Sequence, residues 1–175
     1  MNGLVKSKER VKKFAEVYTP TWLVKRMCEE CEPNISDINE SVFEPTCGNG
    51  NFLKEILARK LNKVALTMKD PKDRDVLALK ALSKIYACEI QEDNVQESRR
   101  LMLDMVLEFC DGKCKYLDAA KSIIEKNIVH GDTLKHIHLD GEPIYFIEWS
   151  ITKDNGILEI KETPHKFADM VGEAE

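Results

Sequence analysis

The chain has 175 residues, of which 43% are hydrophobic, and a net charge of −5. This length suffices for one domain with its own core, and no apolar run reaches membrane length, so we expect a globular protein without a membrane partner. The negative charge excludes a protein that coats nucleic acid by itself. The first six residues show no secretory signal pattern, so we expect a cytoplasmic chain whose six cysteines stay reduced.

Residues 1–13 form a basic N-terminal arm, and residues 14–175 are expected to form a single domain. The basic side chains of the arm are Lys6, Lys8, Arg10, Lys12 and Lys13. With Glu9 they give the arm a charge of +4, so the remaining chain carries −9. Such an arm can contact the phosphates of DNA or be a solvated, frayed terminus, and the sequence leaves both interpretations open.

A helix is predicted directly after Thr19 and Pro20. Threonine is a common helix N-cap, and proline fits the first helical position. We expect this helix to run to about Cys31. The side chains expected to face inward are Trp22, Leu23, Met27 and Cys31.

The stretch Val42–Leu53 is typical of the end of a buried strand, a tight turn and the start of a helix. Pro45 ends the strand because proline cannot donate to a sheet ladder. Gly48 and Gly50 allow positive φ angles and let backbone amides approach a ligand. From Phe52 onward the apolar residues recur at helical spacing. This arrangement predicts a binding pocket at the carboxyl edge of an α/β sheet.

Two common ligand classes fit this turn poorly. A dinucleotide fingerprint needs a third glycine at the place where this chain has Leu53, which argues against NAD and FAD. A P-loop for ATP needs a lysine after the turn, and none follows it here.

The chain then continues as a polar loop over residues 62–75, a short helix to Leu82 and a strand at 84–90. Glu89 ends that strand, where a carboxylate can accept hydrogen bonds from both hydroxyls of a ribose, unless it is merely exposed. Two helices over 92–110 and 116–126 and a strand at 127–134 follow. A strand over 144–151 and another over 157–160 flank Asn155-Gly156, which predicts a β-hairpin.

The string Glu44–Leu53 resembles motif I of the S-adenosylmethionine-dependent DNA amino-methyltransferases, and is most similar to the adenine-N6 enzymes of restriction–modification systems. Val17–Pro20, about 25 residues earlier, resembles motif X of that family. Glu89 and Asp132 occupy the places of motifs II and III, so the resemblance covers about residues 14–135. It implies a Rossmann-like, three-layer α/β sandwich with S-adenosylmethionine as cofactor. The cofactor contacts that it implies are Tyr18, Thr19, Pro20, Glu44, Pro45, Thr46, Cys47, Gly48, Gly50, Phe52, Glu89, Ile90, Asp132 and Thr133.

The catalytic tetrapeptide of the family, Asn/Asp-Pro-Pro-Tyr/Phe after the fourth strand, is absent. Residues 142–145 look superficially similar but precede the expected strand. Glu148 and Trp149 stand where the tetrapeptide belongs and are candidates for accepting hydrogen bonds and stacking on a flipped base. The remaining strands of a seven-stranded sheet have no room, so the fold is expected to be reduced at its C-terminal side.

Two functional hypotheses follow from this resemblance. The chain is either a methyltransferase acting on amino groups in DNA or a catalytically inactive cofactor-binding module. The module would be a regulatory or partner subunit of a restriction–modification or mobile-element system, and the missing tetrapeptide favours it. In both cases we expect DNA to be reached through a partner subunit, in a homo- or hetero-oligomer.

Two cysteine pairs, Cys28–Cys31 and Cys110–Cys114, have spacings that can close a zinc site. Both pairs fall at expected helix ends rather than on zinc-knuckle turns. We therefore expect reduced thiols and no metal.

Overall fold

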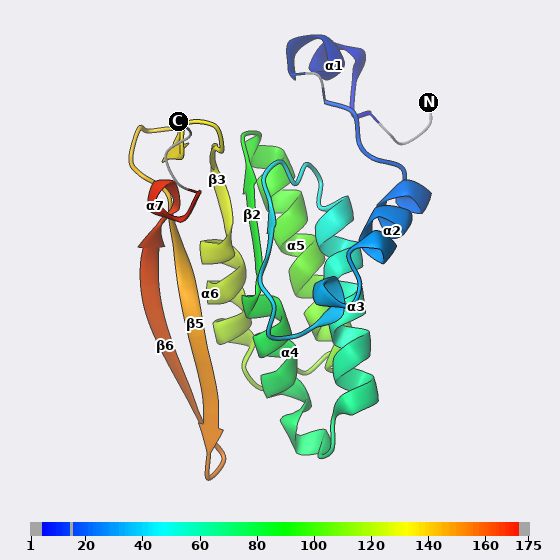
Figure 1. Cartoon of the computed structure of the whole chain (residues 1–175), viewed down its shortest axis with the longest axis vertical. Helices are drawn as coiled ribbons and strands as arrows, with labels where there is room; N and C mark the ends of the chain where they lie inside the picture. Colours follow the sequence, from blue (N-terminus) through cyan, green and yellow to red (C-terminus); the bar gives the residue numbers. More distant parts are fainter. Residues whose placement is uncertain (1–4, 15, 172–175) are drawn as a thin grey trace.

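The computed structural model describes residues 5–14 and 16–171 and has a mixed α/β fold. Its sheet has the order β1-β2-β3-β4 (Figure 1). The strands β1 (Val42–Glu44), β2 (Ile85–Glu89) and β3 (Ile128–Asp132) are parallel, and β4 (Ile137–His138) is antiparallel to β3. The three predicted strands are confirmed. Their parallel arrangement brings their carboxyl ends to one edge of the sheet.

Helices lie before, between and after the strands. They are α1 (Lys8–Phe14), α2 (Thr21–Glu30), α3 (Asn51–Thr67), α4 (Arg74–Ser83), α5 (Glu92–Phe109), α6 (Leu117–Asn127) and α7 (Phe167–Val171), with short 3-10 turns at Asn34–Ser36 and Pro71–Asp73. The helices predicted for residues 92–110 and 116–126 are confirmed. The polar loop predicted from residue 62 is wrong in part, because α3 continues to Thr67. Val64 is fully buried on that last turn, which extends the apolar stripe of the helix.

Strand β2 is buried on both of its faces, as strands of parallel sheets usually are. Ile85 and Ala87 point into the main core beneath the helices. The side chains at the other face, Tyr86 and Cys88, pack in a second cluster with Phe146. Residues from the C-terminal part of the chain therefore cover the face of the sheet opposite the main core.

The C-terminal part is a long β-hairpin of β5 (Tyr145–Asp154) and β6 (Ile157–Lys166), which lies along the left side of Figure 1. Asn155 and Gly156 turn it, with φ angles of 47° and 83°, so the predicted hairpin is confirmed and is longer than predicted. Within the described part of the chain β5 pairs only with β6 and does not join the main sheet. A fourth strand of that sheet is therefore not formed at residues 144–151.

The start of α2 differs from the prediction. Thr19 makes no capping hydrogen bond; instead, the Pro20 carbonyl oxygen accepts hydrogen bonds from the amides of Leu23 and Val24, at 2.9 and 3.0 Å. Pro20 therefore stands one place before the helix, where its carbonyl is the first acceptor.

The inward face of α2 is also different. Val24 and Cys28, spaced four residues apart, are each 1% exposed and form part of the core. Trp22 and Met27 point to solvent, and Cys31 is exposed. The apolar residues of this short helix lie on more than one face, so the sequence does not determine which face is buried. The packing of α2 against α3 determines it.

The N-terminal segment is docked on the first turns of α5. Lys6 Nζ lies 3.0 Å from Asp93 Oδ2 and 2.7 Å from Glu97 Oε2, and Arg10 Nη1 lies 2.7 Å from Asp93 Oδ2. Lys6 and Arg10 bind the protein's own acidic side chains, so for these two residues neither DNA contact nor a solvated, frayed terminus describes the arm. Residues 1–4 of the arm and residues 15 and 172–175 lie outside the described residues.

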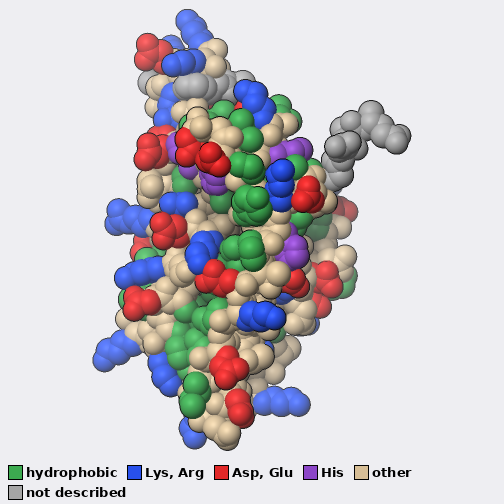
Figure 2. Space-filling model, turned by 90° about the vertical axis from the view of Figure 1, so that its left-hand side faces the viewer, with side chains coloured by type: hydrophobic (Ala, Val, Ile, Leu, Met, Phe, Trp, Pro, Cys, Tyr) green, Lys and Arg blue, Asp and Glu red, His purple; other side chains and the backbone are tan. Residues whose placement is uncertain are grey.

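Acidic and basic side chains intermingle on the face shown in Figure 2, with hydrophobic side chains between them. This face offers no continuous basic surface for DNA. Within residues 5–14 and 16–171, no helix combines the length and the apolar character that crossing a membrane requires.

Candidate functional site

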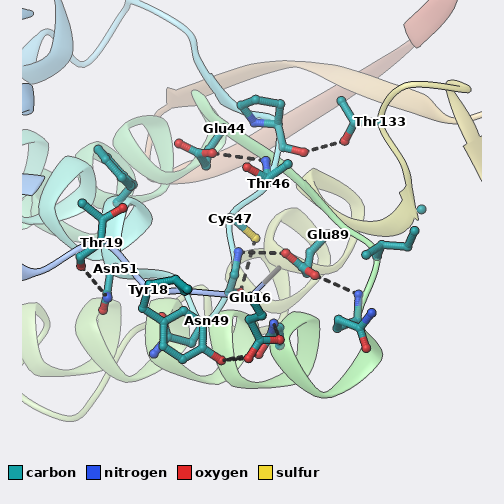
Figure 3. Close-up of a pocket in the computed structure, with 18 of the residues that line it drawn as sticks. Glu16, Tyr18, Thr19, Glu44, Thr46, Cys47, Asn49, Asn51, Glu89 and Thr133 are labelled. Atoms are coloured by element: carbon teal, nitrogen blue, oxygen red, sulfur yellow. Dashed lines mark hydrogen bonds between the residues drawn. The ribbon is translucent and has the colours of Figure 1, made fainter. Parts of the chain in front are cut away.

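A pocket of about 470 Å³ lies at the carboxyl ends of β1, β2 and β3 (Figure 3). This volume is in the range of small-molecule sites. The segment before α2 forms one of its walls. The residues that line it are Glu16, Val17, Tyr18, Thr19, Glu44, Pro45, Thr46, Cys47, Gly48, Asn49, Asn51, Phe52, Glu89, Ile90, Gln91, Asn94, Gly131, Asp132, Thr133 and Leu134.

The structure brings together the residues that the resemblance assigns to cofactor binding, except for Pro20 and Gly50, which do not line the pocket. Sequence reasoning missed several polar residues of the lining, among them Glu16, Asn49 and Asn94. Asn49 lies inside the recognised string and was open to prediction. Glu16 and Asn94 carry no local signal, because only the docking of the N-terminal segment on α5 brings them to the pocket.

The glycine turn has the predicted backbone conformation. Gly48 and Gly50 have φ angles of 53° and 91°, and the Gly50 amide donates to the Cys47 carbonyl at 2.9 Å. A Cβ atom on Gly50 would lie 3.0 Å from Ser98 Oγ and 3.3 Å from Ser98 Cα. The turn therefore packs so closely on α5 that a side chain at Gly50 has no room.

Glu89 ties the turn to the end of β2. Its Oε2 accepts a hydrogen bond from the Gly48 amide at 2.9 Å, and its Oε1 accepts one from the Gln91 amide at 2.8 Å. The residue is 7% exposed. Because each carboxylate oxygen can accept two hydrogen bonds, Glu89 keeps acceptor capacity for a ligand in the pocket.

Two further acceptors of the pocket lack strong donors. Glu44 Oε1 accepts the Thr46 amide at 3.1 Å, and burial raises the pKa of Glu44, with the nearby charge of Glu89 acting in the same direction and hydrogen bonds from Thr46 opposing it. Asn49 Oδ1 is buried and has no hydrogen-bond partner in the described part of the chain. Buried polar atoms normally have a partner, so the unpaired Asn49 oxygen, together with the Glu44 carboxylate, favours a ligand that donates hydrogen bonds or carries positive charge.

The wall contributed by the N-terminal segment is a polar network. Tyr18 Oη lies 2.9 Å from Glu16 Oε1 and 3.0 Å from Asn94 Oδ1, and the Tyr18 ring lies against Gly48. Burial opposes the charge of Glu16, but hydrogen bonds from Arg10 and Tyr18 hold its pKa below the ordinary value. Burial and the neighbouring Glu16 raise the pKa of Tyr18, so it remains a hydroxyl.

The third strand supplies Asp132 and Thr133. Asp132 Oδ1 accepts hydrogen bonds from the amides of Leu134 and Lys135, at 3.0 and 3.2 Å. Desolvation opposes the charge of Asp132, but these bonds and the Lys135 side chain together lower its pKa below the ordinary value. Thr133 Oγ1 donates to the Pro45 carbonyl at 2.5 Å, which joins the loops after β1 and β3.

The charge of the lining is one-sided. It contains four carboxylates, Glu16, Glu44, Glu89 and Asp132, and no Lys, Arg or His. Two cations outside the lining, Arg10 and Lys135, pair with Glu16 and Asp132, so the unbalanced charge comes from Glu44 and Glu89. Cys47 adds no charge, because burial raises the pKa of its thiol to about 12. A pocket of this kind attracts a cation and repels phosphate groups.

The two catalytic candidates lie elsewhere, on β5. Trp149 is 5% exposed, and its Nε1 donates to Asn127 Oδ1 at 2.8 Å, so it is a core residue and is not placed to stack on a base. Glu148 is exposed and lies 3.1 Å from His165 Nε2. Neither residue lines the pocket.

Comparison of the chain with protein-family models, with curated proteins and with solved structures finds no match. The structure itself offers three observations on the pocket. They are a carboxylate-rich lining, an unpaired buried amide oxygen and a glycine turn at the carboxyl edge of parallel strands.

Proposed function

We propose that the pocket binds S-adenosylmethionine and that the chain is a methyltransferase-like cofactor-binding protein. The observation that carries this proposal is the lining of four carboxylates without a basic side chain. S-adenosylmethionine has a sulfonium and an ammonium group against one carboxylate, so it carries a net positive charge that such a lining attracts. NAD and ATP carry phosphates, which it repels.

The polar groups of the pocket match the parts of this cofactor. Glu89 would accept hydrogen bonds from the ribose hydroxyls, and Asp132 would accept one from the adenine amino group. Glu44 and Asn49 hold acceptor atoms without strong donors, as the methionine ammonium group requires. The bound cofactor would supply a sulfonium methyl group as the donor in methyl transfer.

The fold supports a Rossmann-like interpretation of the first part of the chain. It has three parallel strands, with a glycine turn after the first and a carboxylate at the end of each of the next two. This is the arrangement expected of the half of such a sheet that would hold an adenosine. In the described part of the chain the C-terminal hairpin forms a sheet of its own and adds no parallel strand.

We propose further that the chain acts as a partner or regulatory subunit and does not methylate DNA alone. In the described part of the chain β5 does not extend the sheet, and Trp149 belongs to the core. The acceptor side of the reaction would then come from a second chain. The other candidate is a DNA adenine-N6 methyltransferase that becomes active with its partner. It is supported by the residues proposed to bind the methyl donor, which line the pocket.

The proposal is tested by photocrosslinking the purified chain to radiolabelled S-adenosylmethionine. We expect labelling that S-adenosylhomocysteine suppresses and that equal concentrations of ATP or NAD leave unchanged. Labelling that ATP suppresses equally well, or none with the folded protein, would contradict the assignment.

A further inference from the structure

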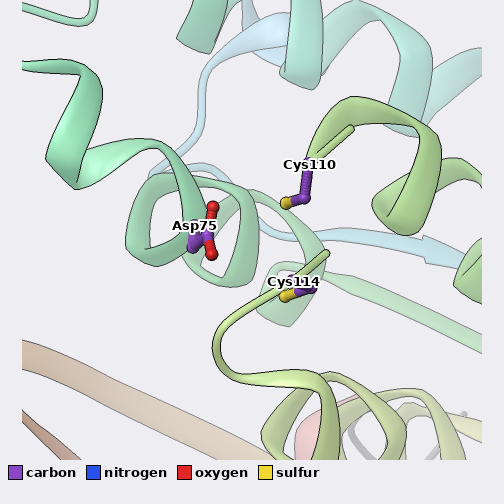
Figure 4. Close-up of side chains that lie close together, drawn as sticks. All are labelled: Asp75, Cys110 and Cys114. Atoms are coloured by element: carbon purple, nitrogen blue, oxygen red, sulfur yellow. The ribbon is translucent and has the colours of Figure 1, made fainter. Parts of the chain in front are cut away.

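Three side chains with metal-binding atoms meet at the amino end of the sheet, far from the pocket. The carboxylate of Asp75 and the thiols of Cys110 and Cys114 lie within 4.8 Å of one another (Figure 4). Asp75 is in the first turn of α4, Cys110 follows the last residue of α5, and Cys114 is in the loop before α6. Because α5 begins beside the pocket, its other end lies at the opposite edge of the fold.

The backbone holds the two cysteines on the same side of a tight loop. Asp111 has a φ angle of 54°, and the next amide, of Gly112, donates to the Leu107 carbonyl at 2.7 Å. The Lys113 amide donates to the Cys110 carbonyl at 3.1 Å. These bonds terminate α5 and fold the chain back, so that Cys114 returns to Cys110.

Asp75 is oriented toward the same point. Its Oδ2 accepts the Lys115 amide at 2.7 Å, which fixes the carboxylate against the residue after Cys114. Its Oδ1 makes only a long ion pair, 3.6 Å from Arg74 Nε, which a bound metal ion would replace. Arg74 itself is held by Asp111, with Nη1 and Oδ2 2.5 Å apart. A backbone hydrogen bond that orients a ligating carboxylate is a common feature of metal sites.

The spacing of the three ligands suits a small divalent cation. Points that are at most 4.8 Å apart have a common centre within about 2.8 Å of each, whereas zinc lies about 2.3 Å from sulfur and about 2.0–2.2 Å from carboxylate oxygen. An inward shift of about half an ångström by each side chain would bring all three ligand atoms to bonding distance from the ion. Two thiolates and one carboxylate would give the bound divalent ion a net charge of −1, which the neighbouring Arg74 offsets.

We propose that Asp75, Cys110 and Cys114 bind a thiophilic divalent cation, zinc in the first place, with a fourth position open to water. The site would join the beginning of α4, the end of α5 and the loop before α6. Cys110 is buried, while Cys114 and Asp75 are half-buried, which gives the ion a route from solvent. This proposal replaces the expectation of no metal. The cysteine spacing alone could not reveal Asp75, which comes from another part of the chain.

The Cys28–Cys31 pair is not part of this group. Cys28 is buried in the α2–α3 contact, and Cys31 is exposed. Of the described residues that could ligate a metal, only Asp75, Cys110 and Cys114 form a group of three or more. The site also lies apart from the pocket, so its test is independent of cofactor binding.

The test is a titration of the reduced, chelator-treated full chain with Co²⁺, followed by displacement with Zn²⁺. We expect thiolate-to-cobalt charge-transfer absorption that saturates at one ion per chain and disappears on adding zinc. Zinc should also raise the melting temperature by several degrees, because an ion that binds only the folded state stabilises it.

Substitutions separate this site from unspecific thiol binding. Cys114→Ser is the main variant, because Cys114 is half-buried and serine fits the loop. We expect Cys114→Ser to lower metal affinity about 10–100-fold and Asp75→Asn to lower it about tenfold. Cys31→Ser removes an exposed thiol outside the group and is the matched control, with unchanged affinity expected.

Several results would overturn the proposal. These are a reduced chain that takes up no cobalt, full uptake by Cys114→Ser, or equal losses in Cys114→Ser and Cys31→Ser. A Cys110–Cys114 disulfide in the isolated protein, with no metal uptake after reduction, would show instead that the pair is a redox couple.

Discussion

Glu89 and Gly48 are joined by a hydrogen bond of 2.9 Å between a buried carboxylate and the backbone amide of the glycine turn. The residues are 41 positions apart, at the end of β2 and in the turn after β1. The same carboxylate also accepts the Gln91 amide. Any ligand that binds Glu89 therefore contacts a group that fixes the shape of two loops.

The first prediction concerns Glu89→Gln. The amide would present an NH₂ group to one of the two backbone amides, and that donor would lose its acceptor. We expect cofactor affinity to fall by about 1–3 kcal/mol, or about 5–150-fold. Calorimetry would measure this, with Glu108→Gln, an exposed acid on α5, as the control. Equal affinity in both variants would contradict the role of Glu89.

The second prediction concerns the room at Gly50. Gly50→Ala combines a φ angle of 91° with a Cβ atom 3.0 Å from Ser98 Oγ. Gly141→Ala has a similar φ angle, 94°, in open space, so it carries the backbone strain without the crowding. Urea unfolding should show a loss of about 1 kcal/mol for Gly141→Ala and of about 2–4 kcal/mol for Gly50→Ala. Similar losses in both would mean that α5 can move away from the turn.

The parts of the fold that the sequence predicts correctly carry local signals. Two glycines spaced like Gly48 and Gly50 after an apolar run indicate a turn after a strand. The apolar run before Glu89 likewise predicts that Glu89 lies at the end of a strand. The hairpin is marked by Asn155-Gly156. Each of these signals lies within about ten residues, so no knowledge of packing is needed to read it.

The parts that the sequence does not predict depend on distant contacts. Lys6 and Asp93 are 87 positions apart in the sequence, and no residue near Lys6 indicates that it has an acidic partner. The buried face of α2 depends on α3, and Asp75 comes to the cysteine pair only through the placement of α4. The sequence also does not predict that Trp149 is buried, because the hydrogen bond between its indole and Asn127 joins two separate elements. This is why Trp149 was interpreted as a candidate for base stacking.

The third prediction concerns the docked N-terminal segment. Arg10→Gln removes the cation that holds both Asp93 and Glu16, and Glu16 in turn positions Tyr18. We expect faster amide exchange over residues 8–14 and a cofactor affinity lowered about 3–10-fold. Lys8→Gln, an exposed substitution on the same helix, is the control. Unchanged exchange in Arg10→Gln would show that these ion pairs do not hold the segment.

The fourth prediction concerns the pH dependence of stability. Lys60 is fully buried, and its Nζ donates to the carbonyls of Asp37 and Glu40. Burial lowers the pKa of Lys60 from 10.5 to about 8. Between these values the unfolded chain binds more protons than the folded chain, so the contribution of Lys60 to stability rises as pH rises.

This contribution is measured as a difference. We expect the free energy of unfolding of the native protein, relative to Lys60→Met, to grow by about 1–3 kcal/mol between pH about 7.5 and 10. Thiols that unfolding exposes titrate in the same range, but they are present in both proteins and their effect cancels. Lys63→Met, exposed on the same helix, should show no such growth. A constant difference would indicate that Lys60 keeps its proton throughout.

The fifth prediction is that the purified chain alone transfers no methyl group to unmethylated DNA. No acceptor tetrapeptide follows a strand of the sheet, and Trp149 is buried. Incorporation of labelled methyl groups measures this directly. Robust turnover that Glu148→Gln abolishes would refute the inactive-subunit proposal and make Glu148 a catalytic residue.

The central claim is that the carboxylate-lined pocket takes a cationic adenosine cofactor, and calorimetric titration of the chain tests it most directly. We predict saturable binding of S-adenosylmethionine at one site per chain, weakened in Glu89→Gln, and no heat with NAD or ATP. No heat with S-adenosylmethionine under conditions in which circular dichroism shows a folded chain, or tighter binding of ATP, would contradict the claim.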